Sequence, residues 1–140
     1  MAFLKGSDFI IHAGDICDPS ILEELAVIAP VTAVRGNNDK GAWAMKVNET
    51  EFLQVGDFLV YVIHDLGQLK IEPAAAHVHA VVSGHSHRPL IEERGSVLYV
   101  NPGSAGPRRF KLPISIGEIV ISGKSASART VELGVDNAMP

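Results

Sequence analysis

The sequence is poor in cysteine, in long apolar runs and in charge, and each shortage excludes a class of protein. Its 140 residues include a single cysteine, Cys17, which excludes a disulfide within the chain and a zinc site built from several thiolates. No apolar run approaches the roughly 18 residues that a membrane-spanning helix requires. The N-terminal stretch lacks a basic flank followed by a long apolar segment, so we expect a cytoplasmic protein without a signal peptide.

Charged residues make up only 20% of the chain, and the formal net charge is −4 with histidine neutral. The basic residues are scattered, which argues against nucleic acid and membranes as partners. Hydrophobic residues make up 46% of the sequence, and a chain of this length can bury a core of its own. We therefore expect one globular domain over residues 1–140.

Short β-branched runs alternate with Gly, Pro, Asn and Asp, a pattern typical of an α/β fold. Residues 8–14 predict a strand, residues 20–29 a helix and residues 31–36 a second strand. A helix between two strands predicts that the strands pair in parallel. Residues 50–64 divide at Gly56–Asp57 into two strands joined by a tight turn, which predicts a β-hairpin.

The second half of the chain predicts further strands. A weak helical signal covers residues 73–77, and a strand signal follows over residues 80–84. Alternating residues separated by Gly turns then predict antiparallel strands. These strands cover residues 95–101, 113–122 and 127–135.

Polar side chains follow the carboxyl ends of the predicted strands. In open α/β sheets ligands collect at this edge, because the loops converge there while the strands hold them rigidly. One carboxylate, one amide oxygen and three imidazoles form a mixed ligand set suited to Mn, Fe, Co or Zn. The side chains concerned are Asp15, Asn37, His64, His85 and His87.

The spacing of His85 and His87 also carries meaning. Residues i and i+2 of an extended segment share a face, so the two imidazoles can reach two neighbouring ions. A His-x-His pair alone is weak evidence, because histidine often packs as a half-buried polar residue. We assign such packing or surface roles to the remaining histidines, His12, His77 and His79.

Five ordered motifs resemble those of the calcineurin-like metallophosphoesterases, and more narrowly those of small bacterial and archaeal phosphodiesterases. The motifs are Gly-Asp at 14–15, Gly-Asn-Asn-Asp at 36–39, His64, Gly-His-Ser-His at 84–87 and Asn-Pro-Gly-Ser at 101–104. The resemblance runs from about residue 8 to about residue 117. It implies a four-layer αββα sandwich of two mixed β-sheets with a two-metal site at the strand ends.

The resemblance also implies roles for the metal donors. Asp15 would bridge both ions, and His87 would bind the first of them. Asn37, His64 and His85 would complete the ligand set of the second ion. The resemblance implies that family members begin with a strand ending in Asp-x-His, and we expect this chain to be truncated relative to them, since residues 1–8 lack that motif. We therefore expect one well-formed site and one incomplete site, with Mn as the leading candidate and Fe, Zn, Co or Ni as alternatives.

Three further residues are assigned to the reaction from the resemblance. Asn38 stands where many relatives have a histidine that protonates the leaving group, and an amide can instead hydrogen-bond a phosphoryl oxygen. Asp39 would orient its neighbour, although a turn-capping role explains it equally well. Arg108 would contact the substrate phosphate. Asp65 or Gln68 would face the metal, since relatives have Gly-His after the histidine at 64.

The function implied is hydrolysis of a small-molecule phosphoester, most specifically a phosphodiester, by metal-activated water, with activity reduced by the incomplete site. The alternative is a weak or inactive phosphoesterase-like scaffold that binds proteins, as in the phosphoesterase-like subunit of retromer. A missing first strand would leave an apolar strand edge exposed. Such an edge invites association between copies of the chain.

Overall fold

The structure is a computed structural model that describes residues 7–14, 16, 19–37, 39–86, 89–103 and 115–132. The elements in chain order are β1 (Ile10–His12), α1 (Pro19–Ala26), β2 (Val31–Ala33), η2 (Ala44–Lys46), β3 (Thr50–Val55), β4 (Phe58–Ile63), η3 (Leu66–Gln68), β5 (Ala80–Val82), β6 (Pro89–Arg94), β7 (Val97–Pro102), β8 (Ser115–Ser122) and β9 (Ser125–Glu132). The predicted α/β class is confirmed.

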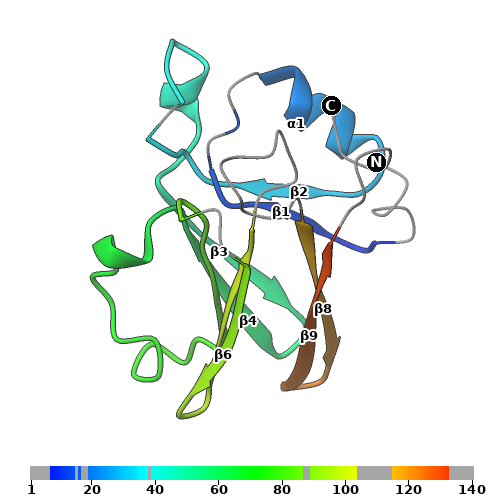
Figure 1. Ribbon diagram of the computed structural model, residues 1–140, viewed down its shortest axis with the longest axis vertical. Helices are drawn as coiled ribbons and strands as arrows, with labels where there is room; N and C mark the ends of the chain where they lie inside the picture. The colour runs from blue at the N-terminus through cyan, green and yellow to red at the C-terminus, as the bar shows by residue number, and fades with distance from the viewer. Residues whose placement is uncertain are drawn as a thin grey trace.

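The described strands form three sheets. β1 and β2 pair in parallel, with Ile11 opposite Thr32, as the strand–helix–strand pattern predicts. Five strands form a mixed sheet in the order β3-β4-β5-β7-β6, with parallel pairs at its centre and antiparallel pairs at both edges. β8 and β9 form a separate antiparallel hairpin. Figure 1 shows α1 lying over the β1–β2 pair, on the side away from the five-stranded sheet.

The hairpin predicted over residues 50–64 is present. β3 and β4 pair antiparallel with Val55 opposite Phe58, and Gly56 in the turn has a positive φ of 58°. β4 reads Phe-Leu-Val-Tyr-Val-Ile and is almost wholly buried, because both faces of the sheet are covered around it. A one-residue slip would turn every side chain of β4 to the opposite face of the sheet. The burial of β4 therefore fixes the register of the hairpin.

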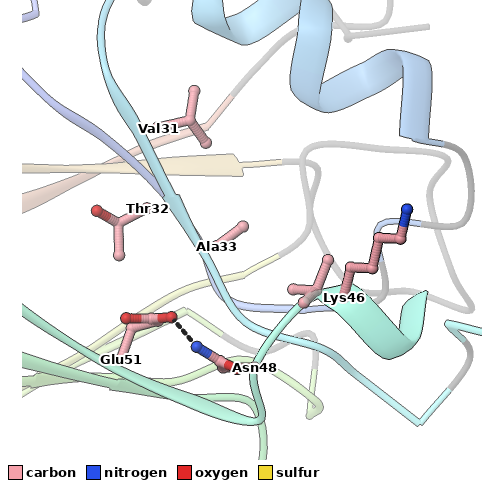
Figure 2. A pocket seen from close by; sticks show the side chains of 7 residues that line it. Val31, Thr32, Ala33, Lys46, Asn48 and Glu51 are labelled. Carbon is pink, nitrogen blue, oxygen red and sulfur yellow. Dashed lines mark hydrogen bonds between the residues drawn. The ribbon is translucent and has the colours of Figure 1, made fainter. Parts of the chain in front are cut away.

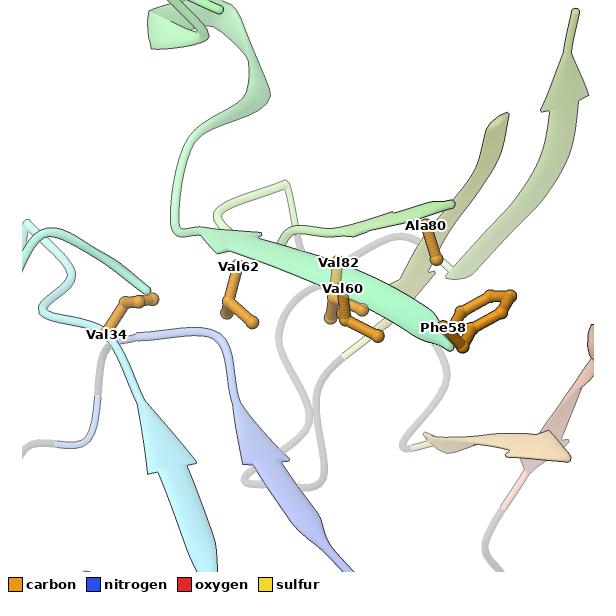
Figure 3. Packing of buried hydrophobic residues seen from close by; sticks show 6 residues of the cluster. All are labelled: Val34, Phe58, Val60, Val62, Ala80 and Val82. Atoms are coloured by element: carbon orange, nitrogen blue, oxygen red, sulfur yellow. The ribbon is translucent and has the colours of Figure 1, made fainter. Parts of the chain in front are cut away.

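The main core lies between the five-stranded sheet and the layer that holds β1 and β2. Figure 3 shows the buried side chains of β4 and β5 projecting toward β1 and β2. Val34, the residue that follows β2, belongs to the same cluster. The buried members are Val34, Phe58, Val60, Val62, Ala80 and Val82. Partly buried residues of β8 and β9, Ile119, Ile121 and Ala126, pack against the same cluster. The core therefore joins all three sheets, and it fixes the ends of β2, β4 and β5 relative to one another.

The other face of the five-stranded sheet is covered by residues 65–79. Tyr61, Ile63 and Val81 pack there against Leu66 and other apolar residues of this segment. The helix predicted at 73–77 is wrong, because those residues form turns and the chain reverses at His77, which has a φ of 60°. None of the helices in the described part of the chain has the length and apolarity needed to span a membrane.

The sequence pattern did not predict β6. Leu90 and Ile91 are both partly exposed, and the run Leu-Ile-Glu-Glu lacks the alternation expected of a strand. The strand exists because it pairs antiparallel with β7, with Arg94 opposite Val97 across a two-residue Gly-Ser turn. That Gly-Ser pair between two strand segments is the signal that could have found it.

The core makes a direct stability prediction. Val62 is fully buried, so we expect Val62→Ala to lower the free energy of unfolding by about 2 kcal/mol through lost burial and a residual cavity. Val120 in β8 is 56% exposed, and Val120→Ala is the matched control, expected to cost less than about 0.5 kcal/mol. Urea denaturation followed by circular dichroism measures both, and equal losses would contradict this placement of the core.

Candidate metal site

His64 is the first residue after β4 and its side chain is buried. Its Nδ1 lies 2.7 Å from the carbonyl oxygen of Ala13, which follows β1. A carbonyl oxygen can only accept a hydrogen bond, so Nδ1 carries the hydrogen and donates it. In the neutral imidazole the other nitrogen, Nε2, then carries the lone pair, which is the form in which imidazole binds metals. A backbone carbonyl holding one ring nitrogen while the other faces outward is the usual arrangement of metal-binding histidines.

The amide of Asn37 faces this lone pair. Its Oδ1 lies 2.8 Å from Nε2 of His64, and an amide oxygen is also an acceptor. Two acceptors at this distance repel each other unless a proton or a cation lies between them. Ligands about 2.0–2.2 Å from a transition-metal ion and at right angles around it are about 3 Å apart. The spacing therefore matches that of two neighbouring ligands of one ion.

His85 supplies a third donor to the same group. Its Nδ1 lies 3.2 Å from Oδ1 of Asn37, and its ring meets the ring of His64 edge-on at a centroid distance of 5.2 Å. The His85 side chain is 47% exposed, so the cluster opens to solvent on this side. Asp65 is also near, with Oδ2 4.0 Å from Nε2 of His85. Oδ1 of Asp65 accepts a hydrogen bond from the Gly67 amide. Gln68, the other residue expected to face the metal, is exposed.

His85 adopts an unusual backbone conformation. Its φ is +67°, and the Ser86 amide donates to the carbonyl oxygen of Gly84 at 2.8 Å, which makes His85 the centre of a γ-turn. A γ-turn with positive φ is rare and strained, and a left-handed backbone costs a non-glycine residue about 1–2 kcal/mol. Strain of this kind concentrates at functional sites.

Asp39 holds the turn that presents Asn37. The Gly36 amide donates to Oδ2 of Asp39 at 2.8 Å, and the Asp39 amide donates to the Gly36 carbonyl oxygen at 3.2 Å. Asp39 is 7% exposed. These two hydrogen bonds are of the kind that the turn-capping alternative predicts. Arg35, just before the turn, is held by its backbone bond to Asn48 and by an ion pair with Glu49 at 2.6 Å.

Glycine is required where the loops approach His64. Gly14 has a φ of +103°, and a Cβ added to it would lie 2.4 Å from Nδ1 of His64. A Cβ on Gly84 would lie 3.1 Å from the Ala13 carbonyl oxygen. These close approaches let the loops after β1 and β5 meet the imidazole.

The structure brings together three of the predicted donors, Asn37, His64 and His85, and places Asp39 behind them. The others, Asp15, Asn38, His87 and Arg108, lie outside the described residues. The sequence reading did not anticipate the carbonyl of Ala13, because a backbone group carries no residue signature. It named the motif around Asn101 without giving that side chain a role.

The donor set fits a divalent transition metal of borderline softness. Two imidazole nitrogens and an amide oxygen suit Mn, Fe, Co, Ni or Zn, whereas calcium prefers an all-oxygen set. Among the described residues no three His, Cys, Asp or Glu side chains lie close enough together to hold a metal ion. The candidate ligands are therefore two imidazoles and the amide of Asn37. A carboxylate would complete it, and Asp15 is the predicted one.

The remaining described histidines have structural contacts, as the sequence predicts. Nδ1 of His79 accepts the Leu59 amide at 2.9 Å, and its ring stacks on Phe58 at 5.1 Å. His12 accepts from the Gly14 amide at 3.3 Å, and His77 is exposed in a turn.

A hollow of about 290 Å³ lies beside β2 (Figure 2). Its lining includes Thr32, Lys46 and an Asn48–Glu51 hydrogen bond of 2.6 Å. None of its lining residues belongs to the group of Asn37, His64 and His85, so this hollow is distinct from the candidate metal site.

Comparisons with known proteins agree with this fold. The family model of the calcineurin-like phosphoesterase superfamily domain matches residues 1–123. A probable metallophosphoesterase of Methanothermobacter thermautotrophicus is 31% identical over 134 residues, which cover 91% of this chain and 77% of that protein. A phosphodiesterase of Methanocaldococcus jannaschii is 28% identical over 108 residues, 67% of this chain and 65% of that protein. The solved vacuolar protein sorting 29 of Cryptosporidium parvum shares the fold with a TM-score of 0.74 at 20% identity, covering 94% and 86% of the two chains.

Proposed function

The chain belongs to the calcineurin-like phosphoesterase superfamily, and on that premise we propose that it is a metal-dependent hydrolase of phosphodiesters. The observation that carries the proposal is the meeting of Nε2 of His64 with Oδ1 of Asn37 at 2.8 Å. Ala13 fixes the hydrogen of His64 on the far nitrogen, so a cation between the two acceptors explains their approach.

In this proposal Asn37, His64 and His85 hold one divalent cation together with Asp15. His87 and Asp15 would face a second position, for which we propose weaker binding than for the first. When bound, the cation supplies a Lewis acid for the phosphoryl oxygens and lowers the pKa of water. Mn is the metal we propose first.

The remaining assigned residues bind and orient the substrate. Asn38 donates a hydrogen bond to a phosphoryl oxygen, and Arg108 pairs with the phosphate. Asp39 keeps the turn at residues 36–39 closed, so Asn37 is held in place before any ligand arrives. An amide at position 38 cannot protonate a leaving group, which favours substrates whose leaving group departs readily as an anion. The similarity to a phosphodiesterase supports diesters as the substrate class.

A protein-binding scaffold is the second candidate. Its support is the shared fold with vacuolar protein sorting 29 and the exposure of Asn37 and His85 at the rim of the site. A scaffold would keep the fold without needing metal-dependent turnover. The two candidates therefore differ in whether metal binding leads to hydrolysis.

Metal removal and restoration separate these candidates. The chain is stripped with a chelator and titrated with Mn²⁺ by calorimetry, and hydrolysis of an activated aryl phosphodiester is followed beside the matching monoester. We expect one tightly bound ion per chain, loss of turnover on chelation, recovery with Mn²⁺ and faster cleavage of the diester.

Asp15→Ala serves as the variant, since it removes the proposed bridging carboxylate. Turnover unchanged by this substitution would refute the metal mechanism. Two tight ions per chain would refute the incomplete second site. Metal binding without turnover would favour the scaffold, and no binding would overturn the metal site itself.

A further inference from the structure

Asn101 lies near the end of β7 and is 6% exposed. β5 and β7 pair in parallel, with Val82 opposite Val100, and the Ser83 amide donates to the Val100 carbonyl oxygen. This pairing places the side chain of Asn101 beside the loop that follows β5. That loop carries His85, so a buried amide group stands directly behind one of the proposed metal donors.

All the polar atoms of the Asn101 side chain are engaged. Nδ2 donates to the carbonyl oxygen of Gly84 at 2.9 Å and to Oγ of Ser86 at 3.1 Å. Oδ1 accepts the amide of Gly103 at 2.9 Å. Two of the three bonds therefore go to the residues on either side of His85.

The peptide group of Gly84 is held from both directions. Its amide donates to the carbonyl oxygen of His64 at 2.9 Å, and its carbonyl oxygen accepts from Asn101 and from the Ser86 amide. The backbone that leads into His85 is thus fixed between the carbonyl oxygen of His64, just after β4, and the Asn101 side chain on β7. A positive φ at a non-glycine residue persists only where surrounding structure enforces it. Among the described residues, His85 and His77 are the non-glycine positions with positive φ.

We propose that Asn101 is a positioning residue that holds His85 in its strained γ-turn and so directs Nδ1 of His85 toward Asn37. The inference rests on the proposed metal site and extends it by naming the side chain that orders its exposed donor. Asn101 does not touch the metal position itself. Without its two donated bonds, the loop at residues 84–86 relaxes to negative φ and the imidazole leaves Asn37.

Asn101→Asp is the sharpest variant, since it keeps an acceptor for the Gly103 amide and loses both donated bonds. We expect its affinity for Mn²⁺, measured by calorimetry on chelator-stripped protein, to fall by about 10- to 100-fold. Asn101→Ser, neutral and smaller, replaces it if the aspartate variant does not fold. Val97→Ala, a buried apolar change at the opposite end of β7, is the control and is expected to leave Mn²⁺ affinity unchanged.

A double-mutant cycle shows whether Asn101 acts through His85. If it does, Asn101→Asp combined with His85→Ala binds Mn²⁺ within about threefold of His85→Ala alone, because the positioned group is already absent. If Asn101→Asp weakens Mn²⁺ binding only by damaging the fold, its loss of affinity adds in full to that of His85→Ala. In the metal-free protein, hydrogen exchange at the Ser86 amide is expected to speed up at least about tenfold in Asn101→Asp, with the β8–β9 amides unchanged.

The outcomes separate this inference from the proposed function. Wild-type protein that binds Mn²⁺ together with an Asn101→Asp variant that binds it equally well overturns the positioning role alone. Losses of Mn²⁺ affinity that add in the double-mutant cycle overturn the positioning role as well. Wild-type protein that binds no Mn²⁺ overturns the metal site, and the positioning role falls with it.

Discussion

Replacing His64 with alanine is expected to lower kcat/KM for an activated aryl phosphodiester by about 10³-fold or more, equivalent to about 4 kcal/mol of transition-state stabilisation. The substitution removes a buried imidazole whose tautomer is set by Ala13 and whose Nε2 lies 2.8 Å from Oδ1 of Asn37. The remaining described donors, Asn37 and His85, are both exposed, so they hold a cation poorly without it. Affinity for Mn²⁺ should fall in parallel with turnover.

His79→Ala is the matched control for this prediction. His79 is also a histidine of the five-stranded sheet region, but its contacts are the Leu59 amide and the ring of Phe58. We expect His79→Ala to lower the midpoint of urea denaturation while kcat/KM stays within about threefold of wild type. Steady-state kinetics at saturating Mn²⁺, with circular dichroism as the test of folding, measures both variants. Activity of a folded His64→Ala protein within tenfold of wild type would refute the role of His64.

Gly14→Ala is expected to lower the free energy of unfolding by about 3 kcal/mol, because two unfavourable effects act together. The residue has a φ of +103°, which side-chain-bearing residues rarely adopt, and the new methyl group would lie 2.4 Å from Nδ1 of His64. The imidazole cannot retreat without losing its bond to the Ala13 carbonyl. Metal affinity should therefore drop along with stability.

Gly56→Ala isolates the backbone part of this effect. Gly56 also has a positive φ, +58°, but nothing lies within 4 Å of a Cβ added there. The control is expected to cost about 1 kcal/mol and to leave Mn²⁺ affinity unchanged. Chemical denaturation and calorimetry of both variants make the comparison. Equal losses for the two glycines would show that the contact with His64 is not as close as described.

Local patterns in the sequence were enough to predict the elements that local interactions specify. The hairpin of β3 and β4 follows from two apolar runs around Gly56–Asp57, and the parallel pairing of β1 and β2 follows from the helix between them. The convergence of Asn37, His64 and His85 was predictable because each follows a strand end.

Elements that depend on distant partners were predicted poorly. β1 covers Ile10–His12 where the sequence predicted residues 8–14, since a strand extends only as far as its neighbour pairs with it. β6 lacks a strand pattern of its own and is ordered by pairing with β7. Turns at residues 73–77 replace a predicted helix, and the positive φ of His77 ends any helical path there.

The sequence by itself placed Asn37, His64 and His85 after the ends of strands, because strand periodicity and glycine turns are properties of neighbouring residues. Only the tertiary structure decided which nitrogen of His64 faces Asn37, since the Ala13 carbonyl that sets it lies 51 residues away along the chain. The same holds for His85, whose backbone is fixed by Asn101 on another strand. Hydrogen bonds between segments distant in sequence are made only after the sheets pack together, and no local pattern encodes them.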